Sequence, residues 1–131
     1  MTIVLDAGAL IAIDRGSRDL LSRLQTAFAN GDRIRVPAGV IGQVWRDGGR
    51  QTLLSRALNR CEEIPLDGRA ARSAGQLCGR TGTRDVIDAS VAVAVGESRG
   101  RDREVVLLTS DADDLRTLLS ALNTVALIVD V

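Results

Sequence analysis

The stretch "TIVLDAGALIAIDR" (residues 2–15) changes its hydrophobic pattern at Asp6. The segment before Asp6 is a short, nearly unbroken apolar run, which is typical of a strand buried on both faces of a sheet. The segment after it, "AGALIAIDR" (7–15), has apolar residues at helical spacing. The stretch therefore predicts a buried strand that leads directly into a helix, with a carboxylate at the junction.

The alternation of strand and helix continues along the rest of the chain. Short apolar runs alternate with segments of helical periodicity, and Gly, Pro, Asn, Ser or Asp stand at most of the boundaries. This order predicts a single α/β domain spanning residues 1–131, with helices packed around a mainly parallel sheet. Beyond residue 15, we expect helices at 17–31, within 35–49, at 49–60, at 67–80, in the second part of 81–100 and at 111–123, and strands at 32–37, 61–66, 103–110 and 124–131.

The helix expected within "RVPAGVIGQVWRDGG" (35–49) contains one polar residue among apolar ones. Pro37 fits a first turn, where its missing N–H costs nothing. Gln43 interrupts an apolar stripe formed by Val40, Ile41, Val44 and Trp45. The segment alone does not decide whether this amide is surface, core or part of a site.

Composition limits the classes of function. The chain has 131 residues, 2% aromatic residues and a net charge of zero, so we expect one domain with an aliphatic core that is not a general polyanion binder. It contains no His, which excludes Ser-His and Cys-His catalysis and every His-ligated metal site.

The sequence also favours a cytoplasmic protein. No apolar run is long enough to span a bilayer, and the first residues lack the charged start and cleavage region of a signal peptide. Cys61 and Cys78 stand alone without a Cys-x-x-Cys motif, so free thiols are expected.

Carboxylates follow the predicted strands. Asp6 ends the first strand and Asp111 follows the strand at 103–110. Ligands of open parallel sheets bind beyond the carboxyl ends of the strands, so these two residues are candidates for one shared site. Asp88 lies three residues after Asp85, and Asp114 lies three residues after Asp111, so each pair shares a helix face.

Two interpretations of these residues stay open. In the first, Asp6, Asp85 and Asp111 are helix N-caps, and Asp88 and Asp114 face the positive end of a helix dipole. In the second, several of them converge at the edge of the core. Two carboxylates about 5 Å apart repel by roughly 3 kcal/mol at an effective dielectric constant near 20, so such a cluster needs a cation. An all-oxygen site without His or Cys suits Mg²⁺ or Mn²⁺ and metal-assisted hydrolysis of a phosphodiester.

Three segments together resemble the PIN-domain family, and most closely the VapC toxins of bacterial toxin–antitoxin pairs. They are "IVLDAGALIA" (3–12), "DVIDASVAV" (85–93) and "VVLLTSDADDL" (105–115), in the family's order and spacing. Each motif is short, but the three together are fairly specific. The resemblance implies a three-layer α/β/α fold, a Mg²⁺- or Mn²⁺-dependent endoribonuclease, a VapB-like antitoxin as partner and a homodimer.

The resemblance also assigns residues. Asp6, Asp88 and Asp111 match the family's acidic positions and are expected to hold the metal, while Thr109 matches a hydroxyl residue that lines the site. The family usually carries Glu where this chain has Gln43. An amide can still accept a hydrogen bond or ligate weakly, but it supplies no negative charge. Asp85 and Asp114 are secondary acidic candidates.

Arginines are the only basic side chains available to contact RNA. Arg80, Arg84 and Arg46 are weak candidates for phosphate contacts, and for Arg46 the sequence slightly favours a solvated helix face instead. Two other classes remain. A receiver-like phospho-acceptor domain would need a basic partner that is normally Lys, and the chain has no Lys. A catalytically silent PIN-like binding module is compatible with Gln43.

Overall fold

The computed structural model describes residues 1–131 and contains a five-stranded sheet in the order β3-β2-β1-β4-β5. Every neighbouring pair of strands is parallel, so the expected α/β fold is confirmed and the sheet is parallel throughout. The strands are β1 (Thr2–Leu5), β2 (Arg33–Pro37), β3 (Glu62–Ile64), β4 (Val105–Thr109) and β5 (Leu127–Asp130).

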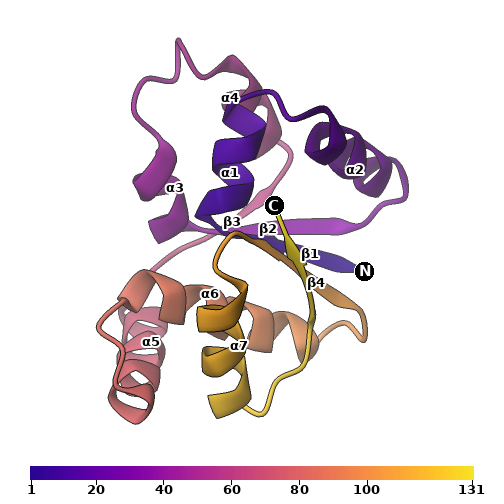
Figure 1. The fold of residues 1–131 in the computed structure, drawn as a ribbon. Helices are drawn as coiled ribbons and strands as arrows, with labels where there is room; N and C mark the ends of the chain where they lie inside the picture. The colour runs from indigo at the N-terminus through magenta and orange to yellow at the C-terminus, as the bar shows by residue number, and fades with distance from the viewer.

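Seven helices cover the two faces of the sheet and make a three-layer α/β/α domain (Figure 1). One face carries α1 (Ala7–Asp14), α2 (Arg18–Ala29), α3 (Ala38–Val44) and α4 (Thr52–Leu58). The other face carries α5 (Gly68–Thr81), α6 (Val86–Arg99) and α7 (Ala112–Ala121). None of these helices combines the length and the apolar character needed to cross a membrane.

The order of the strands reverses between β1 and β4. The chain runs outward from β1 through β2 to β3, then crosses back and continues outward through β4 to β5. The carboxyl ends of β1 and β4 therefore lie side by side at the switch point, where open α/β sheets bind their ligands.

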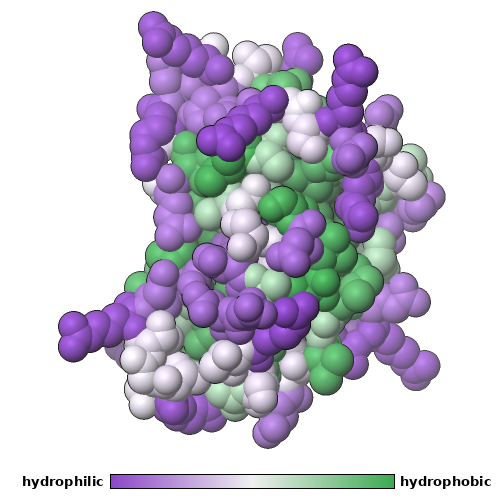
Figure 2. Space-filling model, viewed as in Figure 1, coloured by the Kyte–Doolittle hydropathy of each residue, from purple (hydrophilic) through white to green (hydrophobic).

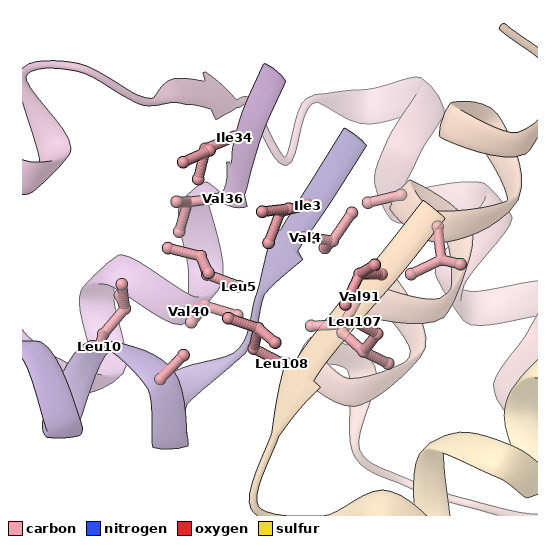
Figure 3. Packing of buried hydrophobic residues seen from close by; sticks show 14 of the residues in the cluster. Ile3, Val4, Leu5, Leu10, Ile34, Val36, Val40, Val91, Leu107 and Leu108 are labelled. Atoms are coloured by element: carbon pink, nitrogen blue, oxygen red, sulfur yellow. The ribbon is translucent and has the colours of Figure 1, made fainter. Parts of the chain in front are cut away.

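Buried aliphatic residues of β1 and β4 form the centre of the core. Both strands are buried along their whole length, as their near-continuous apolar sequence predicts. Figure 3 shows Leu5 and Leu108 turned toward the helices of one layer, whereas Leu107 is turned toward Val91 of α6 in the other. Burying a side chain of this size stabilises the folded state by about 1.5–3 kcal/mol. The packing of β1 and β4 therefore fixes the positions of the residues at their ends.

Most helix boundaries follow their sequence signals. Ser17 caps α2 by accepting a hydrogen bond from the amide of Leu20, and Asp67 caps α5 through the amide of Ala70. The end of α5 expected near Gly79 lies further on. The helix continues to Thr81 and stops at Gly82, which adopts the left-handed conformation with φ of 78°.

The end of α3 differs from the expected apolar stripe. The helix ends at Val44, and Trp45 leaves it in an extended conformation with 38% of its surface exposed. The buried side chain of Gln51 explains the change. Its amide nitrogen donates to the carbonyl of Val44, and its oxygen accepts from the amides of Arg46 and Asp47. These bonds fold residues 45–51 into a loop, so α4 begins only at Thr52.

Candidate functional site

Asp6 is a buried carboxylate at the carboxyl end of β1. Its side chain is held on both oxygens: Oδ1 accepts a 2.7 Å hydrogen bond from the amide of Ala7, and Oδ2 accepts a 2.6 Å bond from the hydroxyl of Thr109. Asp6 is 4% exposed and Thr109 is fully buried at the end of β4. The two neighbouring strand ends are thus joined by a side-chain bond as well as by the sheet.

The same hydroxyl fixes the start of the next segment. Thr109 Oγ1 accepts a 2.9 Å hydrogen bond from the amide of Asp111 while donating to Asp6. The turn between them packs on the first turn of α1, where a Cβ at Gly8 would lie 2.4 Å from Ser110 Oγ and 2.9 Å from Ser110 N. Only glycine leaves room for this approach. Sequence reasoning missed the Gly8–Ser110 contact, which joins residues remote in sequence.

Asp88 reaches the same region from the opposite helical layer. The carboxylate of Asp85 caps α6 by accepting a 3.0 Å hydrogen bond from the amide of Asp88, which fixes the first turn of the helix. One carboxylate oxygen each of Asp88, Asp111 and Asp114 lie within 4.8 Å of one another. Asp88 is half-buried, whereas the other two are exposed. None of these three side chains accepts a hydrogen bond from the protein, so their oxygens are free to bind a ligand.

Two more carboxylates, those of Asp6 and Asp85, are close enough for their charges to act on Asp88. The pKa of Asp88 is raised to about 7, chiefly because burial disfavours the charged form. The negative charges of Asp85, Asp6, Asp111 and Asp114 raise it further, in that order. Five carboxylates therefore share one region, and the repulsion at Asp88 favours either a proton or a cation.

The structure contains features of both earlier interpretations of the acids, each for different residues. Asp6 and Asp85 act as helix caps. Asp111 occupies the N-cap position of α7 but makes no capping hydrogen bond, and it is exposed rather than set at the edge of the core. Asp114, expected to be secondary, belongs to the group with free oxygens, whereas Asp6, expected to be a ligand, has both oxygens engaged.

Gln43 lies on α3, on the face that approaches α6. A Cβ at Gly39, one helical turn earlier, would lie 2.5 Å from Ile87 Cδ1, and Ile87 is next to Asp88. Residues four apart share a helix face, so the position of Gln43 is on this side of α3. Its side chain is exposed and makes no hydrogen bond within the protein.

The three arginines proposed for RNA contacts have different surroundings. Arg46 caps the end of α3 by donating to the carbonyls of Gly42, Trp45 and Gln43. Arg80 lines a hollow beside the last turn of α6, at the opposite end of that helix from Asp88. Arg84 is exposed and directly precedes Asp85, so it is the nearest of the three to the carboxylates along the chain.

Comparison with known proteins supports the fold. The sequence matches no protein-family model and no curated protein sequence. The crystal structure of VapBC2 from Rickettsia felis bound to a DNA fragment from their promoter contains a chain with the same fold, at a TM-score of 0.67. The match covers 100% of this chain and 99% of that chain at 16% sequence identity. The three-layer arrangement implied by the sequence resemblance is therefore confirmed at the level of the fold.

Proposed function

We propose that this protein is a Mg²⁺- or Mn²⁺-dependent endoribonuclease that hydrolyses RNA phosphodiester bonds, and that it is the toxin of a VapBC-type pair. The observation that carries the proposal is the group of free carboxylate oxygens of Asp88, Asp111 and Asp114 beside Asp6. This group lies at the switch point of a sheet whose fold is similar to that of a chain in a VapBC2 complex.

The donors at this site fit a hard divalent cation. They are carboxylate oxygens without any nitrogen or sulfur ligand, which is the set that Mg²⁺ and Mn²⁺ prefer. The ion would be held by Asp88, Asp111 and Asp114. Asp6 would contribute its negative charge nearby without binding the ion directly. When bound, the cation supplies Lewis-acid chemistry for phosphodiester hydrolysis, so the lack of His in the chain is no obstacle.

The other residues of the site act by position. Thr109 holds the carboxylate of Asp6 and the backbone of Asp111 in a fixed relation. Asp85 orders the first turn of α6 and so orients Asp88. Gln43, which lies on α3, would contact the bound cation or RNA as a neutral group. Arg84 would contact an RNA phosphate beside the carboxylates.

The proposal includes two protein partners. The Rickettsia felis chain belongs to VapBC2, which binds a DNA fragment from their promoter. By analogy we propose that a VapB-like antitoxin binds and inhibits this chain. A homodimer is proposed on the sequence resemblance alone.

RNA cleavage tests the enzyme and its site together. The wild type should cleave RNA in Mn²⁺ or Mg²⁺ and lose this activity in a chelator, and both Asp88→Ala and Asp111→Ala should abolish it. Asp113→Ala is a matched control, because Asp113 stands on the same helix start but is fully exposed and pairs with Arg116. Equal cleavage by the wild type and Asp88→Ala would refute the proposed site.

A catalytically silent binding module is the second candidate, because Gln43 lacks the charge of the usual Glu. Thermal unfolding separates the questions of metal binding and catalysis. Millimolar Mn²⁺ should raise the melting temperature of the wild type but not of Asp88→Ala. A metal-dependent shift without cleavage would favour the silent module, and no shift would count against a shared metal site.

A further inference from the structure

Trp45 is the only tryptophan of the chain, and it lies at the surface. The one other aromatic residue, Phe28, is half-buried and covered by the guanidinium of Arg60, whose carbon lies 4.0 Å from the ring centre. Trp45 has no such cover, because it leaves the end of α3 in an extended conformation with 38% of its surface exposed. It is therefore the one exposed aromatic side chain that is open to a ligand.

The loop after α3 fixes the orientation of this ring. A Cβ at Gly48 would lie 2.5 Å from Cζ2 and 3.0 Å from Cη2 of Trp45, so the ring rests against the backbone of Gly48. The buried side chain of Gln51 closes the loop by accepting hydrogen bonds from the amides of Arg46 and Asp47. A ring held in place before binding loses little conformational freedom when a flat ligand stacks on it.

Arg46 presents hydrogen-bond donors beside the ring. Its Nη1 donates to the carbonyls of Gly42 and Trp45 at 3.1 Å and 2.7 Å. Its Nη2 donates to the carbonyl of Gln43 at 3.1 Å. These bonds use three of the five guanidinium N–H groups and leave the Nε–H and one Nη2 N–H free. Two neighbouring donors of an exposed guanidinium can bind two oxygens of one phosphate.

The charges around the loop favour an anion at Arg46. Residues 45–51 contain Arg46, Arg50 and a single acid, Asp47. Oδ2 of Asp47 lies 3.7 Å from Nε of Arg50, and the nearby carboxylate of Asp14 accepts a hydrogen bond from Gln51. Figure 2 shows hydrophilic side chains at the upper left of the view, where Figure 1 draws the connection from α3 to α4. Arg46 is left without a carboxylate partner.

The helix that carries these two residues begins beside the candidate site. Gly39, in the first turn of α3, approaches Ile87, which is next to Asp88. Trp45 comes six residues after Gly39, which is about 9 Å further along the helix axis at 1.5 Å per residue. One strand of RNA can therefore contact both the carboxylates and the end of α3.

We propose that Trp45 and Arg46 form a binding subsite for one unpaired nucleotide of single-stranded RNA. The base stacks on the exposed surface of Trp45, and the free donors of Arg46 bind the adjoining phosphate. An unpaired nucleotide offers both a flat base and a phosphate, whereas the bases of a duplex are covered by their neighbours. The inference rests on the RNA substrate proposed above and gives neither residue a role in the chemical step.

Because Trp45 is the only tryptophan, its fluorescence reports directly on the subsite. The full chain is titrated in chelator, so that no cleavage takes place, with a single-stranded RNA of mixed sequence and with the same RNA as a duplex. We expect saturable quenching by the single strand and much less by the duplex. Inorganic phosphate should leave the emission unchanged, because it has no base to stack.

Variants separate stacking from charge, with the anisotropy of labelled single-stranded RNA as the measure of affinity. Trp45→Leu keeps an apolar side chain but has no aromatic face, so it should weaken binding on the order of tenfold, and Trp45→Phe should lose less. Arg46→Lys keeps the charge but loses the paired donors, so binding should weaken while its salt dependence stays the same. Val125→Ala, at a 77% exposed apolar residue before β5, is the control and should bind as the wild type does.

The outcomes distinguish the subsite from the nuclease. RNA that binds and is cleaved without a change in Trp45 emission, or with full affinity for Trp45→Leu, would overturn the subsite and leave the nuclease standing. Quenching with the expected variant effects but no cleavage in Mn²⁺ would support the subsite and count against the enzyme. No binding of RNA would overturn both.

Sedimentation of the RNA-free proteins separates RNA from a protein partner. Trp45→Leu should have the same mass in solution as the wild type and the same far-ultraviolet circular dichroism. A changed mass, together with unquenched emission of the wild type in RNA, would assign Trp45 to a protein interface and overturn the proposal.

Discussion

The hydroxyl of Thr109 donates a 2.6 Å hydrogen bond to Oδ2 of Asp6, across 103 residues of sequence. Both residues are buried at the ends of adjacent strands, and the hydroxyl also accepts from the amide of Asp111. One oxygen atom therefore connects the end of β1 to the backbone of Asp111, the second residue beyond β4. The carboxylates of the candidate site are arranged around the Thr109 hydroxyl, so the loss of its hydrogen bonds should affect both stability and site geometry.

Thr109→Val should reduce the free energy of unfolding by about 1–3 kcal/mol, because it keeps the shape but leaves Asp6 Oδ2 and the Asp111 amide without partners. Urea unfolding at neutral pH measures the change. Thr109→Ser retains the hydroxyl and should lose less. If valine and wild type unfolded at the same urea concentration, the hydrogen bond would contribute nothing to stability.

Asp88→Asn should stabilise the metal-free protein in a pH-dependent manner. The folded-state pKa of Asp88 is about 7, above the unfolded value of about 3.9, so ionising this group opposes folding. The penalty is absent below about pH 4, grows as the pH rises and is complete above about pH 7. We expect a gain of about 1–2 kcal/mol near pH 8, after allowing for solvent screening of a half-buried group.

Urea unfolding of both proteins in chelator, from acidic to alkaline pH, measures this difference. Asp113→Asn is the control, since Asp113 lies outside the carboxylate group and should show no such trend. A stability difference between wild type and Asp88→Asn that did not grow with pH would contradict repulsion at Asp88.

The sequence predicts the strands, and the carboxylates that follow them, because these depend only on residues adjacent along the chain. The apolar runs of β1 and β4 and the Asp that follows each are local patterns, and the parallel sheet then brings their ends together. That reasoning placed Asp6 and Asp111 correctly at adjacent strand ends. It could not show that the Asp114 carboxylate accepts no hydrogen bond while each oxygen of Asp6 accepts one, because this depends on where Thr109 points.

Specific side-chain contacts that no hydrophobic pattern indicates explain what the sequence did not predict. The exposure of Trp45 follows from the hydrogen bonds of Gln51, which no periodic pattern indicates. The need for glycine at position 8 follows from Ser110, which is remote along the chain. Similarly, the 64% exposure of Leu127 follows from the hollow between its side chain and α2 rather than from its own strand pattern.

Gly8→Ala should destabilise the protein by about 1–3 kcal/mol, because the new Cβ would press against Ser110 and displace the turn that carries Asp111. The displaced turn should also reduce the rise in melting temperature caused by Mn²⁺. Adding Ser110→Gly removes the side-chain part of the clash and should recover some of both losses. A Gly8→Ala protein with wild-type stability and metal response would show that the turn moves without cost.

The two glutamines near the end of α3 should differ in their effect on stability. Gln51→Ala removes the partners of the Val44 carbonyl and of the Arg46 and Asp47 amides, and should cost about 1–3 kcal/mol. Gln43→Ala should leave the free energy of unfolding within about 0.5 kcal/mol of the wild type, because this side chain is exposed. Thermal or urea unfolding compares them, and equal losses would contradict the assignment of Gln51 as the residue that holds the loop.

Gln43→Glu tests whether α3 takes part in the candidate metal site. The substitution keeps the size of the side chain and adds a negative charge on the face of α3 that approaches α6. A carboxylate there attracts a bound cation, so we expect Mn²⁺ to bind on the order of tenfold more tightly, which corresponds to about 1.4 kcal/mol. In metal-free buffer the same charge should lower the melting temperature, because it adds to the repulsion around Asp88.

A titration of melting temperature against Mn²⁺ concentration measures both effects on one protein. Gln25→Glu makes the same change on an exposed position of α2 and controls for net charge. Only Gln43→Glu should reverse its effect on stability when metal is added, since only there would the new charge face the cation. If both variants behaved alike, Gln43 would be an ordinary surface residue, and the cation would be held by the carboxylates of α6 and α7 without help from α3.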